Sequence, residues 1–230
     1  MLRRLFTVVA LLSSALSQPV VAADLTPLET RWLQGIWPAV THAREALALP
    51  LDIVVQPQDT PGNAPMALGF VGGRCKLVLS MRGNPEGQRQ FDALQPALRD
   101  AALELMAAHE LGHCRRYLDG AWYGMPAGFV AARPPASLSP ELQTAWLDMR
   151  SSRREEGYGD LVGLAWTRER HPELYARLHA WLVAERSAEL LPGSHHDTLA
   201  WLSLARDPAV LDGQPMFDAA ARVWLQGLKD

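Results

Sequence analysis

The residues best suited to chemistry form the segment 109–113, His-Glu-Leu-Gly-His. On a helix, residues four positions apart lie on one face about a turn from each other, so His109 and His113 are close enough to bind one metal ion. Glu110 lies beside them and can accept a proton. The pattern H-E-x-x-H predicts a site in which two histidines and a third protein ligand hold Zn²⁺ and leave one position for water.

A third ligand is expected on a later helix, where Glu156 and Asp160 occupy positions i and i+4. Both carboxylates face the same side of that helix, so one can bind the metal while the other accepts a hydrogen bond from a metal-bound imidazole. Glu155, about 100° away around the helix, is the alternative third ligand. Gly157 and Gly159 each cost a helix about 1 kcal/mol relative to Ala, which indicates a close approach of two helices there.

A nearer candidate for the third ligand is Asp119, at the last place of the longer pattern H-E-x-x-H-x-x-G-x-x-H. The glycine that turns the chain back in that pattern is replaced by Arg116. We therefore expect the helix to continue and to carry Asp119 away from the metal.

Hydrophobic periodicity places both motifs on helices. The first lies on a helix that begins near Pro96 and ends near Gly120, and the second on a helix that begins at Pro140 and ends at about Arg170. Further helices are predicted at residues 27–47, 174–190, 198–204 and 216–228, and short aliphatic strands at 51–56, 66–71 and 75–81. Residues 82–88 are expected to form a polar loop, and residues 125–140 a long connection. This order of elements predicts a mostly helical α+β fold.

The chain has 230 residues, of which 48% are hydrophobic and 20% charged, so it is long enough for one well-cored domain. We expect that domain to span residues 24–230, with a sheet-containing lobe (24–120) and a helical lobe (121–230). The net charge of −3 gives no overall attraction to nucleic acid or to anionic lipid, so neither is an expected partner.

Residues 1–23 have the features of a signal peptide: Arg3 and Arg4, an apolar stretch at 5–16, and Val-Ala-Ala before Asp24. This leader predicts secretion and a mature chain without a membrane span; an uncleaved leader would instead be an N-terminal membrane anchor. Cys75 and Cys114 are the two cysteines of the chain. An oxidising compartment would allow them to form a disulfide, although two separate buried thiols are the alternative.

The segments 103–113, Leu-Glu-Leu-Met-Ala-Ala-His-Glu-Leu-Gly-His, and 156–163, Glu-Gly-Tyr-Gly-Asp-Leu-Val-Gly, together resemble those of gluzincin metalloproteases. More narrowly they resemble the CAAX-prenyl-protease type, which shows H-E-x-G-H and E-x-x-A-D-x-x-G; Gly159 replaces the Ala. The resemblance covers about 20 residues. Integral membrane members of the family have spans that this chain lacks, so soluble periplasmic relatives are the better comparison.

The resemblance implies a zincin-like fold with a small mixed sheet packed beside the H-E-x-x-H helix, and one Zn²⁺ per chain. It implies His109, His113 and Glu156 as metal ligands, Glu110 as general base and Asp160 as the partner of a zinc-bound histidine. It also implies an edge strand above the site that aligns peptide substrates, for which residues 75–81 are the best match.

The resemblance further suggests a donor to the oxyanion in a late histidine-containing segment, which His195 or His196 matches, with Asp197 to orient one of them. An exposed polar turn is the other interpretation of this loop. Together these features predict a secreted, periplasmic zinc-dependent endopeptidase that acts on peptides or proteins. The alternatives are a non-catalytic binding protein that keeps the fold and the metal, and a zinc hydrolase of a non-peptide amide such as a cell-wall link.

Overall fold

The computed structural model describes residues 24–57, 64–122, 124–125, 129, 133–188 and 193–227. The predicted leader, residues 1–23, lies outside this part of the chain. The helices are α1 (Pro27–Glu45), α2 (Pro85–Ala93), α3 (Arg99–Leu118), α4 (Pro140–Arg170), α5 (Tyr175–Ala188), α6 (Leu199–Leu204) and α7 (Met216–Trp224), and the strands are β1 (Leu51–Pro57), β2 (Met66–Val71) and β3 (Arg74–Arg82). The predicted α+β class, mostly helical with a small mixed sheet, is confirmed. Within the described residues, no helix has the length and apolar character needed to cross a bilayer.

The sheet has the strand order β1-β3-β2, with β3 parallel to β1 and antiparallel to β2. Gly72 and Gly73 join β2 to β3 in a two-residue hairpin, and both have positive φ (59° and 74°), as such a turn requires. Because β3 pairs on both sides, the expectation that residues 75–81 form the edge strand is wrong. The edge strand that pairs with β3 through the hairpin is β2.

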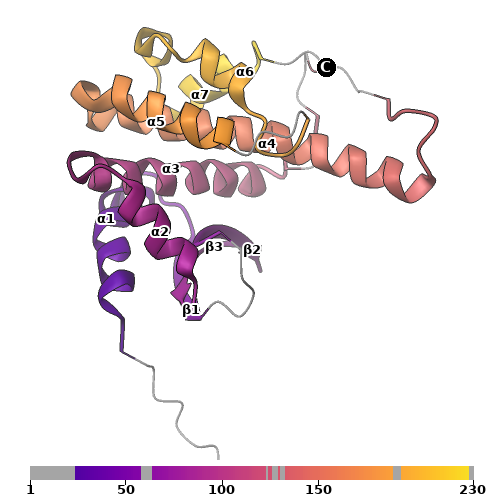
Figure 1. Cartoon of the computed structure of the whole chain (residues 1–230). Helices are drawn as coiled ribbons and strands as arrows, with labels where there is room; N and C mark the ends of the chain where they lie inside the picture. The colour runs from indigo at the N-terminus through magenta and orange to yellow at the C-terminus, as the bar shows by residue number, and fades with distance from the viewer. Residues whose placement is uncertain are drawn as a thin grey trace, which may run out of the picture.

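Helix α3 lies between two layers (Figure 1). It packs against α1 and the sheet on one side and against α4 on the other, with α5 beside α4 and with α6 and α7 beyond these two helices. Most of α3 is buried, whereas α4 is buried only from Arg153 onward. The helix that carries H-E-x-x-H is therefore the centre of the hydrophobic core, which fixes its side chains in place.

Helix α2 is a difference from the sequence prediction, which placed a loop at residues 82–88. Asn84 caps this helix by accepting a hydrogen bond from the backbone N–H of Glu86, and Pro85 occupies the first turn. Its buried positions are only Gly87 and Phe91, so the segment shows no apolar periodicity that would predict a helix.

Cys75 and Cys114 form a disulfide between β3 and α3. Cys114 directly follows His113, so the covalent link joins the sheet to the helix at the H-E-x-x-H segment. The bond rules out the Cys114 thiolate as a metal ligand.

Candidate metal centre

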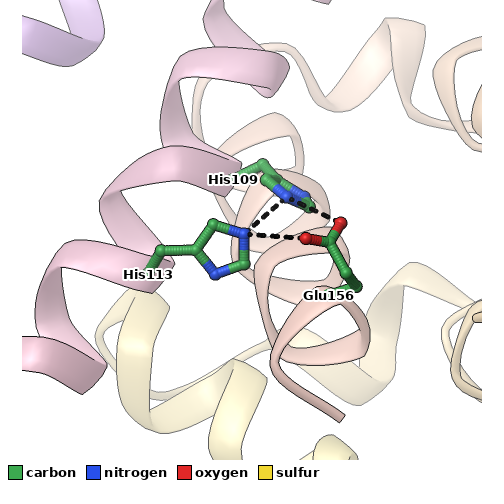
Figure 2. Close-up of side chains that lie close together, drawn as sticks. All are labelled: His109, His113 and Glu156. Carbon is green, nitrogen blue, oxygen red and sulfur yellow. Dashed lines mark hydrogen bonds and ion pairs between the residues drawn. The ribbon is translucent and has the colours of Figure 1, made fainter. Parts of the chain in front are cut away.

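Three side chains from two helices converge on one point (Figure 2). His109 and His113 extend from α3 and Glu156 from α4, and their ligand atoms all lie within 4.8 Å of one another. The Nε2 atoms of the two imidazoles are 2.9 Å apart, and each lies 3.4 Å from a different oxygen of Glu156. Both imidazoles are buried. Two histidines and a carboxylate are a common donor set for catalytic zinc, so these residues fit such an ion.

Asp160 orients one of the two imidazoles. Its carboxylate is fully buried and lies 3.0 Å from Nδ1 of His109, which leaves Nε2 of that ring toward the cluster. It also accepts hydrogen bonds from Thr198 (2.6 Å) and from two nitrogens of Arg186 (2.6 and 3.0 Å). Nδ1 of His113, in contrast, has no hydrogen-bond partner among the described residues. Asp160 therefore fixes the ring orientation of His109.

The cluster favours positive charge. Burial lowers the pKa of His109, but the carboxylates of Asp160 and Glu156 outweigh this effect and raise that pKa to about 10. Burial raises the pKa of Asp160, yet the positive charge of Arg186 and the contact with His109 hold it well below its usual range. Three carboxylates, including that of Glu110, thus surround the imidazoles, and Arg186 opposes them as a cation. A divalent ion would complete the neutralisation of this buried group.

Two glycines that the sequence singled out have different roles. A side chain at Gly159 would place its Cβ 2.8 Å from the ring of His109, so the absence of a side chain there lets α4 approach α3 at the cluster. A Cβ at Gly157 would instead meet the ring of Trp201 at 2.3 Å. The close approach of two helices around the cluster therefore depends on Gly159, whereas Gly157 makes room for α6.

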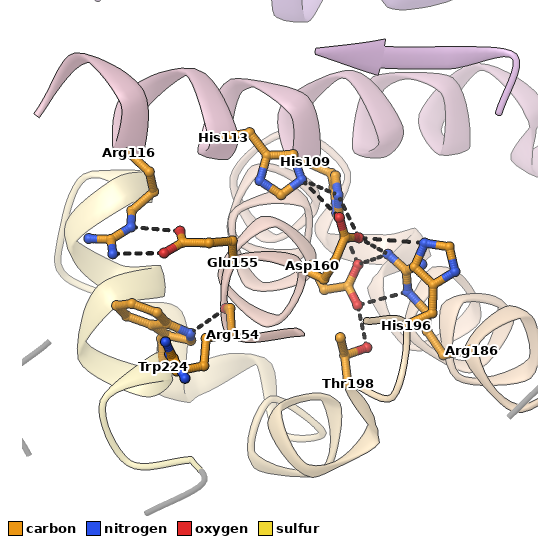
Figure 3. Close-up of polar contacts among 11 residues, drawn as sticks. His109, His113, Arg116, Arg154, Glu155, Asp160, Arg186, His196, Thr198 and Trp224 are labelled. Carbon is orange, nitrogen blue, oxygen red and sulfur yellow. Dashed lines mark hydrogen bonds and ion pairs between the residues drawn. The ribbon is translucent and has the colours of Figure 1, made fainter. Parts of the chain in front are cut away.

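The two alternative ligands, Glu155 and Asp119, point elsewhere; Figure 3 shows the first of them. Glu155 is buried about 100° around α4 from Glu156 and points away from the imidazoles, where it accepts two hydrogen bonds from Arg116 at 2.8 and 2.9 Å. Burial raises the pKa of Glu155, and the charge of Arg116 opposes this rise. Asp119 caps the end of α3 and accepts a hydrogen bond from Arg115 at 2.9 Å. Of the three carboxylates weighed as third ligand, the structure brings only Glu156 to the imidazoles.

Glu110 lines a cleft of about 450 Å³ that contains the cluster. Strand β2, with Met66 and Leu68, and helix α5, with Arg186, also line this cleft. Glu110 forms no hydrogen bond or ion pair with any residue that the structure describes, and burial raises its pKa while the two imidazoles lower it. Its carboxylate is therefore available to a molecule in the cleft.

Of the two late histidines, His196 lies at the cleft and His195 is not among the residues that line it. Nε2 of His196 is 3.8 Å from an oxygen of Glu156. The side chain of His196 is 56% exposed. Its partial burial and the positive charge of Arg186 lower its pKa to about 4, so the ring is neutral at neutral pH. Asp197 does not contact either ring, contrary to expectation; it accepts hydrogen bonds from Arg153 and from the backbone N–H of Gly193.

Arg186 and Thr198 are the site residues that the sequence analysis missed. Both reach Asp160 from segments 26 and 38 residues away, so no local spacing connects them to the motif. An arginine near the end of a helix is common in any protein, and it gives no signal of a buried partner. Their roles could be found only from the folded arrangement.

The chain matches no known protein family model, no curated protein and no solved structure. Its chemistry is therefore inferred from its own residues.

Proposed function

We propose that the protein is a zinc-dependent endopeptidase with a zincin-like fold. The observation that supports this proposal is the convergence of His109, His113 and Glu156 at a cleft in which the carboxylate of Glu110 has no described partner. A metal site with a purely structural role does not need a free carboxylate beside its ligands. Zinc is proposed because two imidazoles and one carboxylate are the donor set of several zinc hydrolases.

The chain's own residues would divide the chemistry among them. A bound Zn²⁺ would supply Lewis acidity toward a carbonyl and toward water. Glu110 takes a proton from the attacking water and passes it to the leaving amine, so one peptide bond and one water become a carboxylate and an amine. His196, as a neutral ring, donates its N–H to the developing oxyanion. Asp160 accepts a hydrogen bond from Nδ1–H of His109 and so keeps Nε2 of that ring toward the metal position.

Strand β2 is suited to align an extended peptide in the cleft. The carbonyl oxygen of Pro65 accepts a hydrogen bond from the N–H of Ser80, so every second residue from Pro65 bonds to β3. The backbone groups of Met66 and Leu68 then point away from β3, and both residues line the cleft. A substrate strand could pair with these groups.

Secretion to the periplasm is part of the proposal. The disulfide between Cys75 and Cys114 supports it, because such bonds persist in oxidising compartments and are rare in the cytosol. The predicted leader supports it as well.

The experiment is a hydrolysis assay on denatured casein with purified protein, with and without a chelator, followed by return of Zn²⁺. We expect hydrolysis that the chelator abolishes and that added zinc restores. The variant Glu110→Gln should retain the metal by elemental analysis and lose at least about 100-fold in kcat. If Glu110→Gln cleaves casein as fast as the wild type, the mechanism is wrong. If metal is bound and no peptide is cleaved, the protein is better described as a metal-containing binding protein.

A further inference from the structure

The loop of residues 193–198, which carries His196, is attached to α4 at two points, of which Figure 3 shows the one between Thr198 and Asp160. At the first, Nε of Arg153 donates to the backbone carbonyl of Asp197 at 2.6 Å, and a second nitrogen of the guanidinium lies 2.9 Å from the Asp197 carboxylate. At the second, the hydroxyl of Thr198 donates to Asp160 at 2.6 Å. The Asp197 carboxylate also accepts the N–H of Gly193, which closes the loop on itself.

These two attachments lie on either side of the metal ligand. Arg153 precedes Glu156 by three residues and Asp160 follows it by four, so all three lie on the same face of α4 about one turn apart. The anchored residues of the loop are Asp197 and Thr198, and His196 directly precedes them. Nε2 of His196 is 3.8 Å from an oxygen of Glu156. The loop therefore crosses α4 above the metal ligand, with an anchor on each side.

We propose that Arg153 is a positioning residue that acts through Asp197 to hold His196 over the metal centre, a role that rests on the proposed peptidase function. Arg153 is not among the residues that line the cleft, and its hydrogen bonds go to Asp197. Its guanidinium also lies 6.0 Å from the ring of Trp201 in α6, so the loop is its route to the site while Trp201 ties it to the core. Its side chain is 11% exposed and that of Asp197 is 16% exposed, so the pair is shielded from solvent. Such a pair holds its geometry better than an ion pair on an open surface.

The chain offers a matched control in Arg116. This arginine is 13% exposed, pairs with Glu155 at 2.8 Å, and joins α3 to the face of α4 that carries Glu155. Removing it breaks a buried arginine–carboxylate pair next to Glu156 without touching the loop that carries His196. Any effect that arises only from weakening α4 should therefore appear in Arg116→Gln as well as in Arg153→Gln.

The kinetic test is a double-mutant cycle on casein hydrolysis. Arg153→Gln and His196→Ala should each lower kcat by about 100-fold, the effect of losing one oxyanion donor, with little change in KM or in zinc affinity. The double variant should be no slower than His196→Ala alone to within about twofold, because Arg153 acts through His196. Arg153→Lys should recover part of kcat, and the effect of Arg116→Gln should multiply with that of His196→Ala. The proposal is overturned if the losses in kcat of Arg153→Gln and His196→Ala multiply in the double variant. It is also overturned if either single variant has a normal kcat.

Hydrogen exchange supplies a measurement that does not depend on activity. In folded Arg153→Gln protein, the backbone amides of residues 193–198 should exchange faster than in the wild type, and in Arg116→Gln they should not. Asp197→Ala removes the carboxylate contacts with Arg153 and with the N–H of Gly193 but leaves the bond to the backbone carbonyl, so it should also exchange faster than the wild type. Unchanged exchange in Arg153→Gln overturns the proposal. If wild-type protein cleaves no substrate, the proposed function fails, and the exchange rates alone decide whether Arg153 holds the loop.

Discussion

Replacing Asp160 with asparagine removes one charge from the centre of the site and nearly preserves the size of the side chain. Asp160 takes part in four hydrogen bonds, one with His109, one with Thr198 and two with Arg186. Asparagine has one acceptor oxygen and cannot satisfy all of these donors. The substitution should therefore weaken both the metal site and the fold.

The two losses have different expected sizes. Loss of the carboxylate that orients a metal-bound histidine lowers metal affinity by about 10- to 100-fold, or about 1.4 to 2.7 kcal/mol. Arg186, which is 14% exposed, would lose its closest charged partner and keep one carboxylate, that of Glu156, at 3.4 Å. Breaking a buried ion pair by removing one partner costs about 3 to 5 kcal/mol in unfolding free energy.

Glu155→Gln is the matched control for this experiment. Glu155 is also a buried carboxylate of α4 that binds an arginine, yet it faces away from the imidazoles. We expect it to lose a similar unfolding free energy in urea titrations of the metal-free protein. Its zinc affinity, measured by competition with a chromophoric chelator, should stay within about twofold of the wild type, because no ligand changes and the amide oxygen of glutamine can still accept a hydrogen bond from Arg116, which keeps the rotation of α4. Equal loss of zinc affinity in both variants, or wild-type affinity in Asp160→Asn, would refute the assignment of Asp160 as the residue that orients His109.

Three further predictions concern the neighbourhood of the cluster. Gly159→Ala would place a methyl group 2.8 Å from the ring of His109, so zinc affinity should fall by about tenfold or more; an unchanged titration would mean that α4 can move away at no cost. Leu68→Pro removes an N–H of β2 that points away from β3, so it should raise KM for peptides about tenfold with little change in stability. Ala67→Pro instead breaks a hydrogen bond to β3 and should lower the unfolding free energy by about 1 to 3 kcal/mol. Equal KM values in the two variants would exclude pairing of the substrate with β2. Reduction of the disulfide, which closes a separation of 39 residues, should lower the unfolding free energy by about 4 kcal/mol, as read from urea titrations with and without reductant.

The parts of the fold that the sequence predicts are those set by local spacing. The four-residue steps in H-E-x-x-H and between Glu156 and Asp160 place side chains on one helix face wherever the helix lies, and Pro140 after Ser139 marks the start of α4 in both sequence and structure. The hairpin at Gly72 and Gly73 also depends on local sequence, since its turn type is set by those two residues.

The remaining features depend on contacts between distant segments. Strand order is an example: β1, β2 and β3 have similar compositions, so the sequence does not reveal that β3 lies in the centre. The partners of Asp160 and the anchor at Arg153 are others, because each joins α4 to a later segment through a single side chain. Helix α2 has too few apolar residues to show a period, and it becomes recognisable only through its cap.

The choice between Glu155 and Glu156 shows how such a contact decides chemistry. Neighbouring residues on a helix point about 100° apart, so a modest rotation of α4 would bring either carboxylate toward the imidazoles. Arg116 favours the rotation that turns Glu156 toward the imidazoles, because it binds Glu155 away from them. Burying Glu155 without that partner would cost free energy. Gly159 favours the same rotation, since only a residue without a side chain fits against His109. The arginine that occupies the glycine position of the longer H-E-x-x-H-x-x-G-x-x-H pattern thus helps to direct Glu156 toward the two imidazoles.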